Sequence, residues 1–285
     1  MEKLKMIILT LIVTCLIFSD YSSLYAEDTL TLQIHPYLPS TELTRRFTPL
    51  ANYLGQKIEQ PVTIRIAKNY QEHIDQVGRD KVDIAYMGPA SFVKLIDTYG
   101  KKPILARLEI NGKPTFRGAI ITAKNSSLQT LSDLKEYRFA FGDPNSTMSH
   151  LVPRFMLKKA GVDINKLAGY KFLYSHHNVA LGVLIGDFDA GAVKEEIFYK
   201  YKDRGLKVLA WTPAVSEHVF IASNSLPEKT VRALRNALYN LKDDEKSAAI
   251  MSAIKNNMTA MISASDKDYD NLRIILQTLE KGVNP

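Results

Sequence analysis

Strand-like segments alternate with helix-like segments along most of this chain, and this alternation constrains the fold more than any other feature of the sequence. Residues 29–34 alternate polar and apolar side chains, as a strand does, and apolar residues between 43 and 54 recur at helical spacing. Residues 61–67 and 82–87 are further predicted strands, each followed by a predicted helix. Repeated alternation of this kind predicts an α/β protein whose helices pack on largely parallel sheets.

Two extended segments divide the chain and predict two lobes rather than one sheet. Residues 118–122 and 211–220 bracket a middle region of about the size of a small domain. We interpret them as the crossover strands of a hinged protein. The predicted first lobe takes residues 27–118 and 214–285, and the predicted second lobe takes residues 119–213.

Two local patterns give sharper expectations. Pro49 lies inside the first helical pattern, which predicts that this helix is kinked or starts later than the pattern suggests. Residues 227–279 show helical patterns and little strand pattern, so we expect the end of the chain to be mainly helical.

The first 26 residues have the pattern of a secretory signal peptide. Two lysines precede an apolar stretch over residues 6–18, and the polar region that follows ends in a small residue, Ala26. We expect cleavage after Ala26 and a periplasmic protein. The alternatives are an uncleaved anchor helix, for which the apolar run is short of the roughly 20 residues required, and a lipoprotein modified at Cys15.

Composition excludes several functions. Cys15 is the only cysteine, so the mature chain has no thiol and depends on its core alone. The net charge of +7 favours anionic ligands or surfaces, but no long Lys/Arg block indicates nucleic acid. The six histidines show no metal-binding spacing, and no Gly-x-Ser-x-Gly motif is present. We therefore expect no cofactor, no metal and no enzymatic activity.

Three strand-to-helix corners carry polar side chains where α/β folds bind their ligands. The densest spans residues 142–150, in which Ser146, Thr147 and Ser149 offer hydroxyl groups at a helix start. Backbone amides and hydroxyls in such a corner suit a tetrahedral oxyanion. A simple capping turn is the alternative interpretation.

The other two corners are less specific. Tyr86 precedes a Gly-Pro pair that is typical of a helix start, and a capping role explains the pair equally well. His176 lies in the third corner, where it can donate to an anion, lie at the surface or ligate a metal.

The run Asp-Pro-Asn-Ser-Thr at residues 143–147, followed by Leu-Val-Pro at 151–153, resembles the signature of a known family. This family comprises the periplasmic phosphonate/phosphite/phosphate-binding proteins of ABC transporters. Residues 81–89 and 176–190 are also similar to it, and the resemblance covers roughly residues 29–225. It implies a two-lobed α/β fold, the type II periplasmic-binding fold, which closes on a ligand between the lobes.

The resemblance also implies which side chains hold the tetrahedral head group. These are Tyr70 on the first lobe and Ser146, Thr147 and His176 on the second. Glu196 lies where related aminophosphonate binders place a carboxylate for the amine of the ligand.

The sequence departs from the family pattern at three places. Met148 replaces the third Ser of the run, and Phe116 replaces an expected aromatic hydroxyl on the first crossover strand. Arg117, beside it, either adds charge to the site or belongs to the surface. His218, with Glu217 beside it, stands where the second amine-binding carboxylate is expected. We therefore expect an oxyanion pocket with an incomplete amine site.

The sequence thus predicts a monomeric periplasmic solute-binding protein that captures a small phosphorus oxyanion between its lobes for ABC import. The alternative keeps the fold but makes the protein the ligand-sensing partner of a membrane histidine kinase. The predicted ligand-binding residues are Tyr70, Tyr86, Phe116, Arg117, Ser146, Thr147, Ser149, His176 and Glu196.

Overall fold

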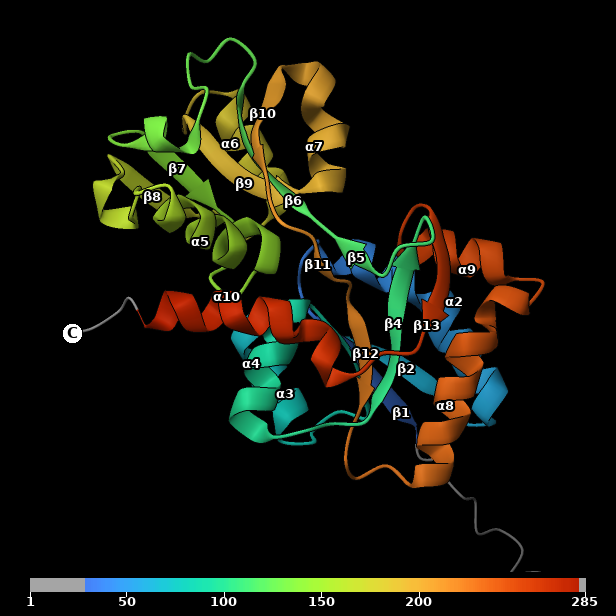
Figure 1. Ribbon diagram of the computed structural model, residues 1–285. Helices are drawn as coiled ribbons and strands as arrows, with labels where there is room; N and C mark the ends of the chain where they lie inside the picture. Colours follow the sequence, from blue (N-terminus) through green and yellow to red (C-terminus); the bar gives the residue numbers. More distant parts are fainter. Residues whose placement is uncertain (1–28, 282–285) are drawn as a thin grey trace, which may run out of the picture.

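The computed structural model describes residues 29–281, which form two α/β lobes (Figure 1). The predicted signal peptide, with its cleavage site after Ala26, lies outside the described residues. Within residues 29–281, none of the helices has both the length and the apolar character needed to cross a membrane.

The first lobe is built on a six-stranded sheet with the order β13-β4-β12-β3-β1-β2. The strands β1, β2 and β3 are parallel, whereas β12 runs antiparallel to its neighbours β3 and β4, and β13 runs antiparallel to β4. The bounds of these strands are Leu30–Ile34 (β1), Val62–Ile66 (β2), Ile84–Met87 (β3), Ile104–Ile110 (β4), Val219–Ala222 (β12) and Met258–Ile262 (β13).

Helices cover both faces of this sheet. The helices α2, α8 and α9 share one buried apolar cluster on one face, and α3, α4 and α10 share another on the opposite face. Their bounds are Ser40–Ile58 (α2), Tyr70–Gly78 (α3), Pro89–Tyr99 (α4), Glu228–Asn240 (α8), Ser247–Ile254 (α9) and Asp270–Glu280 (α10).

The second lobe is built on a five-stranded sheet with the order β10-β6-β9-β7-β8. A π-helical turn, Thr147–Leu151, leads directly into its helix α5. The elements are β6 (Gly118–Ala123), β7 (Arg138–Phe141), α5 (Val152–Lys159), β8 (Gly169–Phe172), α6 (His176–Leu184), β9 (Ala190–Lys194), α7 (Glu195–Tyr201) and β10 (Leu206–Trp211).

The chain crosses between the sheets in two short strands, β5 (Thr115–Phe116) and β11 (Val215–Ser216), which pair with each other antiparallel. A second link between the lobes is apolar. Met148 and Val152 pack into the same buried cluster as Tyr269 and Leu272 near the end of the chain. Figure 1 shows α10 lying beside α5 of the second lobe and α4 of the first, and both pairs are in contact.

One local expectation is wrong and another is incomplete. The helix α2 begins at Ser40 and contains Pro49, so the alternative of a later start is wrong. The end of the chain is mainly helical, as expected, but it also contains a strand, β13, at the edge of the first sheet. The strand that β13 pairs with, β4, lies far away in the sequence, so no local sequence pattern predicts β13.

Candidate ligand-binding site

Aromatic side chains from three strand ends form the first-lobe side of the candidate site. His35, directly after β1, stacks on Tyr37 with ring centroids 4.7 Å apart and on Tyr86 at 5.4 Å, and it meets Tyr70 edge-on at 5.2 Å. All four side chains are buried. Tyr70 begins α3, which the Asn69 side chain caps. The N-terminus of α3 and the C-terminal ends of β1 and β3 therefore lie close together.

The predicted oxyanion corner supplies the second-lobe side. The Ser146 hydroxyl caps the π-helical turn by accepting a hydrogen bond from the Ser149 amide at 3.2 Å. The Ser149 hydroxyl donates to the carbonyl of Ala192 in β9, so it holds the turn against the sheet. A side chain at Gly142 would collide with Ser149, which explains why glycine stands at that position. Of the three hydroxyls predicted to bind the ligand, that of Ser149 is therefore used in a hydrogen bond within the second lobe.

The two lobes touch at this corner. The Thr147 hydroxyl oxygen accepts a hydrogen bond from the Ala90 amide at the start of α4, at 3.0 Å. Lys94, one turn further along α4, donates to the side chain of Asn145 at 3.1 Å. Because the Thr147 oxygen accepts, its hydroxyl proton is left to be donated to a ligand.

Tyr70 faces the same corner. Burial raises the pKa of Tyr70 well above its ordinary value and Asp143 adds to the shift, while a hydrogen bond with the Ser146 side chain opposes it. The phenol is therefore protonated at neutral pH and able to donate. The structure thus brings together three of the predicted residues, Tyr70, Ser146 and Thr147, from opposite lobes.

His176 is the first residue of α6 and is 4% exposed. Its Nδ1 accepts a hydrogen bond from the Lys194 amide at 3.1 Å, which assigns the hydrogen of the neutral ring to Nε2. That Nε2 is buried and has no hydrogen-bond partner among the described residues. Burial, followed by the nearby Lys194, lowers the pKa of His176 well below its ordinary value, so the ring is neutral.

Lys194 ends strand β9, and sequence reasoning did not identify it. Its side chain is buried, its ammonium lies 4.3 Å from the centre of the Tyr37 ring, and it donates to His218 Nε2 at 3.4 Å. The signal that points to Lys194 is its place at the carboxyl end of a strand, directly before α7. A lysine there is usually solvated, but Tyr37 and His218 of the first lobe lie against this one.

A hydrogen-bonded chain continues from Lys194 into the first lobe. His218 Nδ1 donates to Glu217 Oε2 at 2.8 Å, and the other carboxylate oxygen of Glu217 accepts from Lys255. Burial, followed by the charge of Lys194, lowers the pKa of His218 to about 4, although Glu217 opposes this. The ring of His218 is therefore neutral and connects a buried lysine to a buried carboxylate.

Three other predicted residues surround this chain. Phe116 places its ring 5.1 Å from His218, with the Lys255 ammonium 5.3 Å above it. Tyr86 stacks on His218 with centroids 5.2 Å apart. Glu196, the second residue of α7, is half-buried and acts electrostatically on Lys194.

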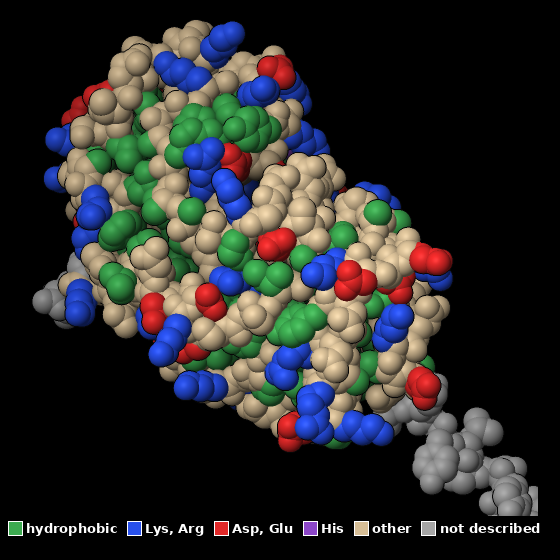
Figure 2. Space-filling model, turned by 45° about the vertical axis from the view of Figure 1, so that its right-hand side comes forward, with side chains coloured by type: hydrophobic (Ala, Val, Ile, Leu, Met, Phe, Trp, Pro, Cys, Tyr) green, Lys and Arg blue, Asp and Glu red, His purple; other side chains and the backbone are tan. Residues whose placement is uncertain are grey.

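Arg117 has other partners. Its guanidinium forms a salt bridge with Glu195 at 2.8 Å and lies 4.0 Å above the ring of Trp211. The side chain is 40% exposed. On the face shown in Figure 2, further Lys and Arg side chains are scattered over the surface with acidic side chains among them.

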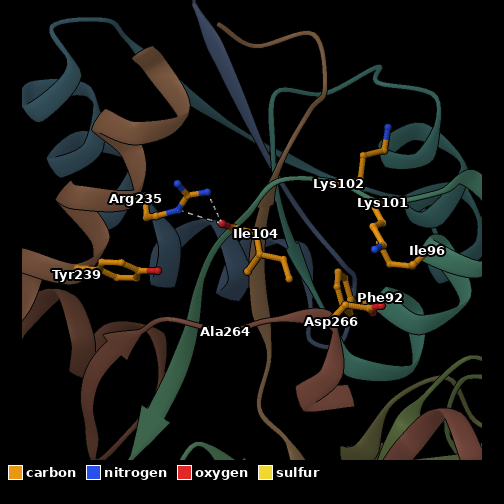
Figure 3. Close-up of a pocket in the computed structure, with 9 residues that line it drawn as sticks. All are labelled: Phe92, Ile96, Lys101, Lys102, Ile104, Arg235, Tyr239, Ala264 and Asp266. Atoms are coloured by element: carbon orange, nitrogen blue, oxygen red, sulfur yellow. Dashed lines mark hydrogen bonds between the residues drawn. The ribbon is translucent and has the colours of Figure 1, made fainter. Parts of the chain in front are cut away.

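A groove of about 380 Å³ lies elsewhere on the first lobe, beside β4 (Figure 3). Two of its three cationic side chains have partners: Arg235 donates twice to the carbonyl of Ile104, and Lys102 forms a salt bridge with Asp80 at 2.6 Å. The third, Lys101, is exposed. Over residues 29–281, no group of three or more His, Cys, Asp or Glu side chains is placed to hold a metal ion.

Two lobes with polar side chains buried where they meet are the architecture of a two-lobed binding protein. The model of a family described as "ABC transporter, phosphonate, periplasmic substrate-binding protein" matches residues 32–269. The chain therefore belongs to this family of periplasmic substrate-binding proteins, whose members are binding components of transporters and not enzymes.

Individual relatives agree with this assignment. The chain is 26% identical to a probable phosphite-binding protein, PhnD1, of Prochlorococcus marinus, over 95% of this chain and 97% of the relative. It is 24% identical to the phosphate-import protein PhnD of Mycolicibacterium smegmatis, over 86% of this chain and 84% of the relative. The solved structure of PhnD1 with methylphosphonate has the same fold, with a TM-score of 0.80, 24% identity and coverage of 89% and 98%.

Proposed function

We propose that the protein binds a small phosphorus oxyanion (a phosphonate, phosphite or phosphate) between its lobes and delivers it to an ABC permease. The observation that carries this proposal is the buried, unpartnered Nε2 of His176 beside Lys194. Leaving a buried donor unsatisfied costs about 1–3 kcal/mol. A ligand oxygen that accepts from His176 would remove this cost.

The surrounding groups suit an anion. Tyr70 and Thr147 each retain a hydroxyl proton, His176 is a neutral donor, and Lys194 is a cation. Donors that converge from both lobes match the several acceptor oxygens of a tetrahedral oxyanion. The names of the relatives, which refer to phosphite, phosphate and methylphosphonate, support phosphorus as the central atom.

Opening and closing would be a hinge motion at the paired strands β5 and β11. In this proposal residues 27–118 and 214–285 move as the first lobe and residues 119–213 as the second. The hydrogen bond between Thr147 and Ala90 would break on opening and re-form on closing, so the ligand and the lobe contact would stabilise each other.

Thermal unfolding tests the proposal with phosphate, phosphite, methylphosphonate, 2-aminoethylphosphonate and sulfate as ligands. A ligand that binds only the native state raises the unfolding temperature, and we expect at least one phosphorus anion to do so. His176→Asn should abolish the shift. The matched control is His177→Asn, because the neighbouring His177 is bonded to Tyr201 at 3.1 Å instead. Stabilisation by sulfate alone, or by none of the five, would contradict the proposal.

A further inference from the structure

We propose that Lys194 sets the charge selectivity of the site, so that the protein takes amine-free phosphorus oxyanions and rejects aminophosphonates. This inference rests on the proposed function and specifies its ligand class. It concerns a residue that differs from the hydroxyls and the histidine implied by the family resemblance.

The charges buried where the lobes meet do not balance. Lys194 is a buried cation and Lys255 a partly buried one, whereas Glu217 is the buried carboxylate, which Lys255 contacts directly and Lys194 reaches through His218. Both oxygens of Glu217 are occupied, one by Lys255 and the other by the side chain and amide of His218. Within the described part of the chain, no carboxylate oxygen comes within 4.0 Å of the Lys194 ammonium. The half-buried Glu196 acts electrostatically on Lys194 without forming a salt bridge with it, so the Lys194 ammonium has no carboxylate in contact and is available to an anionic ligand.

His218 determines how many hydrogens of the Lys194 ammonium remain free to donate to a ligand. Its Nδ1 hydrogen is donated to Glu217, so its Nε2 accepts from Lys194. An ammonium has three hydrogens, and His218 uses one of them. The Tyr37 ring, 4.3 Å away, supports the cation without using a hydrogen-bond donor. Lys194 thus keeps donor capacity for the oxygen of an anion.

Lys194 and His176 form one unit, because the Lys194 amide holds His176 Nδ1 and leaves Nε2 as the donor. A single residue therefore places a cation through its side chain and orients a neutral donor through its backbone. An anion that bridges the two groups would satisfy both. The ammonium of an aminophosphonate would instead meet the Lys194 charge. Glu217 has no free oxygen to receive it, and the half-buried Glu196 already acts electrostatically on Lys194.

Calorimetry on the full mature chain tests this inference with methylphosphonate and 2-aminoethylphosphonate. We expect the native protein to bind methylphosphonate more tightly, and Lys194→Met to weaken methylphosphonate binding by about ten- to hundredfold while narrowing the preference between the two ligands. Lys194→Arg should retain the preference, because it keeps the charge. Lys171→Met, which removes an exposed lysine of β8, is the matched control and should bind as the native protein does.

The outcomes separate the two proposals. If the native protein binds neither phosphonate nor phosphate nor phosphite, the proposed function fails. If it binds methylphosphonate and Lys194→Met binds equally tightly, with an unchanged urea midpoint, the function stands and the role of Lys194 is wrong. Tighter binding of 2-aminoethylphosphonate than of methylphosphonate by the native protein would also overturn the role of Lys194.

Discussion

The hydroxyl oxygen of Thr147 accepts a hydrogen bond from the backbone amide of Ala90, and the two residues belong to different lobes. Ala90 lies in the first turn of α4, where backbone amides have no partner within the helix. The second lobe therefore satisfies an amide of the first. This contact joins the predicted oxyanion corner to the helix that follows β3, so Thr147 lies at the lobe interface as well as in the proposed site.

Replacing Thr147 tests this double role. Thr147→Val keeps the shape but removes both the acceptor for Ala90 and the donor for a ligand. We expect methylphosphonate binding to weaken by about 1.5–3 kcal/mol, the range for hydrogen bonds to charged groups. Thr147→Ser, which keeps the hydroxyl, should bind within about threefold of the native protein. Calorimetry measures both, and equal affinity for the valine variant would place the anion elsewhere.

The pH dependence of binding should report Lys194. Burial, and to a smaller extent Lys255, lowers the pKa of Lys194 to about 8 in the ligand-free protein. Lys194 is therefore charged below pH 8 and loses its proton as the pH rises through that value. The other groups that act on its pKa are Glu196, Glu217 and Arg46.

We expect anion affinity to fall above about pH 8, by up to roughly tenfold per pH unit. The measurement is the ratio of affinities of the native protein and Lys194→Met for methylphosphonate at each pH, because the titration of the ligand itself cancels in this ratio. A ratio that stays constant from about pH 7 to about pH 9 would show that Lys194 does not contribute.

The pair Glu217 and Lys255 should be a strong determinant of stability. Glu217 is fully buried; burial alone would raise its pKa, but Lys255 and His218 hold it below its ordinary value. Glu217→Gln leaves the Lys255 charge without its partner, and we expect a loss of about 3–5 kcal/mol in the free energy of unfolding. The double variant Glu217→Gln, Lys255→Met should recover part of this loss. Urea denaturation of both proteins provides the test, and equal stability of the double and single variants would contradict it.

Gly118 is required at the start of β6 because the space around it is filled. A Cβ there would lie 2.8 Å from the backbone oxygen of Val193 and 3.0 Å from the Cβ of Met148. We expect Gly118→Ala to destabilise the protein by about 1–3 kcal/mol. Gly169→Ala is the control, because a Cβ at Gly169 meets nothing within 4 Å. The urea midpoints of the two variants should differ, and similar midpoints would mean that the lobe adjusts around Gly118.

The local patterns of the sequence were sufficient to predict the α/β alternation and the two lobes. They were not sufficient for β13, whose residues Met258–Ile262 are stabilised as an edge strand by pairing with β4. They also allowed a later start for α2, whereas packing of its buried face keeps Pro49 inside a helix that begins at Ser40. Both errors arise from tertiary contacts that no short stretch of sequence contains.

The candidate site, too, could be predicted from the sequence only in part. The Ser-Thr corner and His176 have a recognisable motif or position in the chain, and the structure places them around one lobe contact and one buried donor. The proposed role of Lys194 depends on its burial between the lobes and on the tautomer of His218, which Glu217 determines. Neither property can be deduced from residue types and spacing.

The apolar cluster that contains Met148, Val152, Tyr269 and Leu272 links the lobes without a peptide bond. A rotation that separated the lobes would draw α5 away from α10 and expose part of that cluster to water. Exposure of apolar surface increases heat capacity, and its burial decreases it. Binding of a small hydrophilic anion should therefore carry a negative heat-capacity change, because lobe closure removes apolar surface of the protein, rather than of the ion, from contact with water.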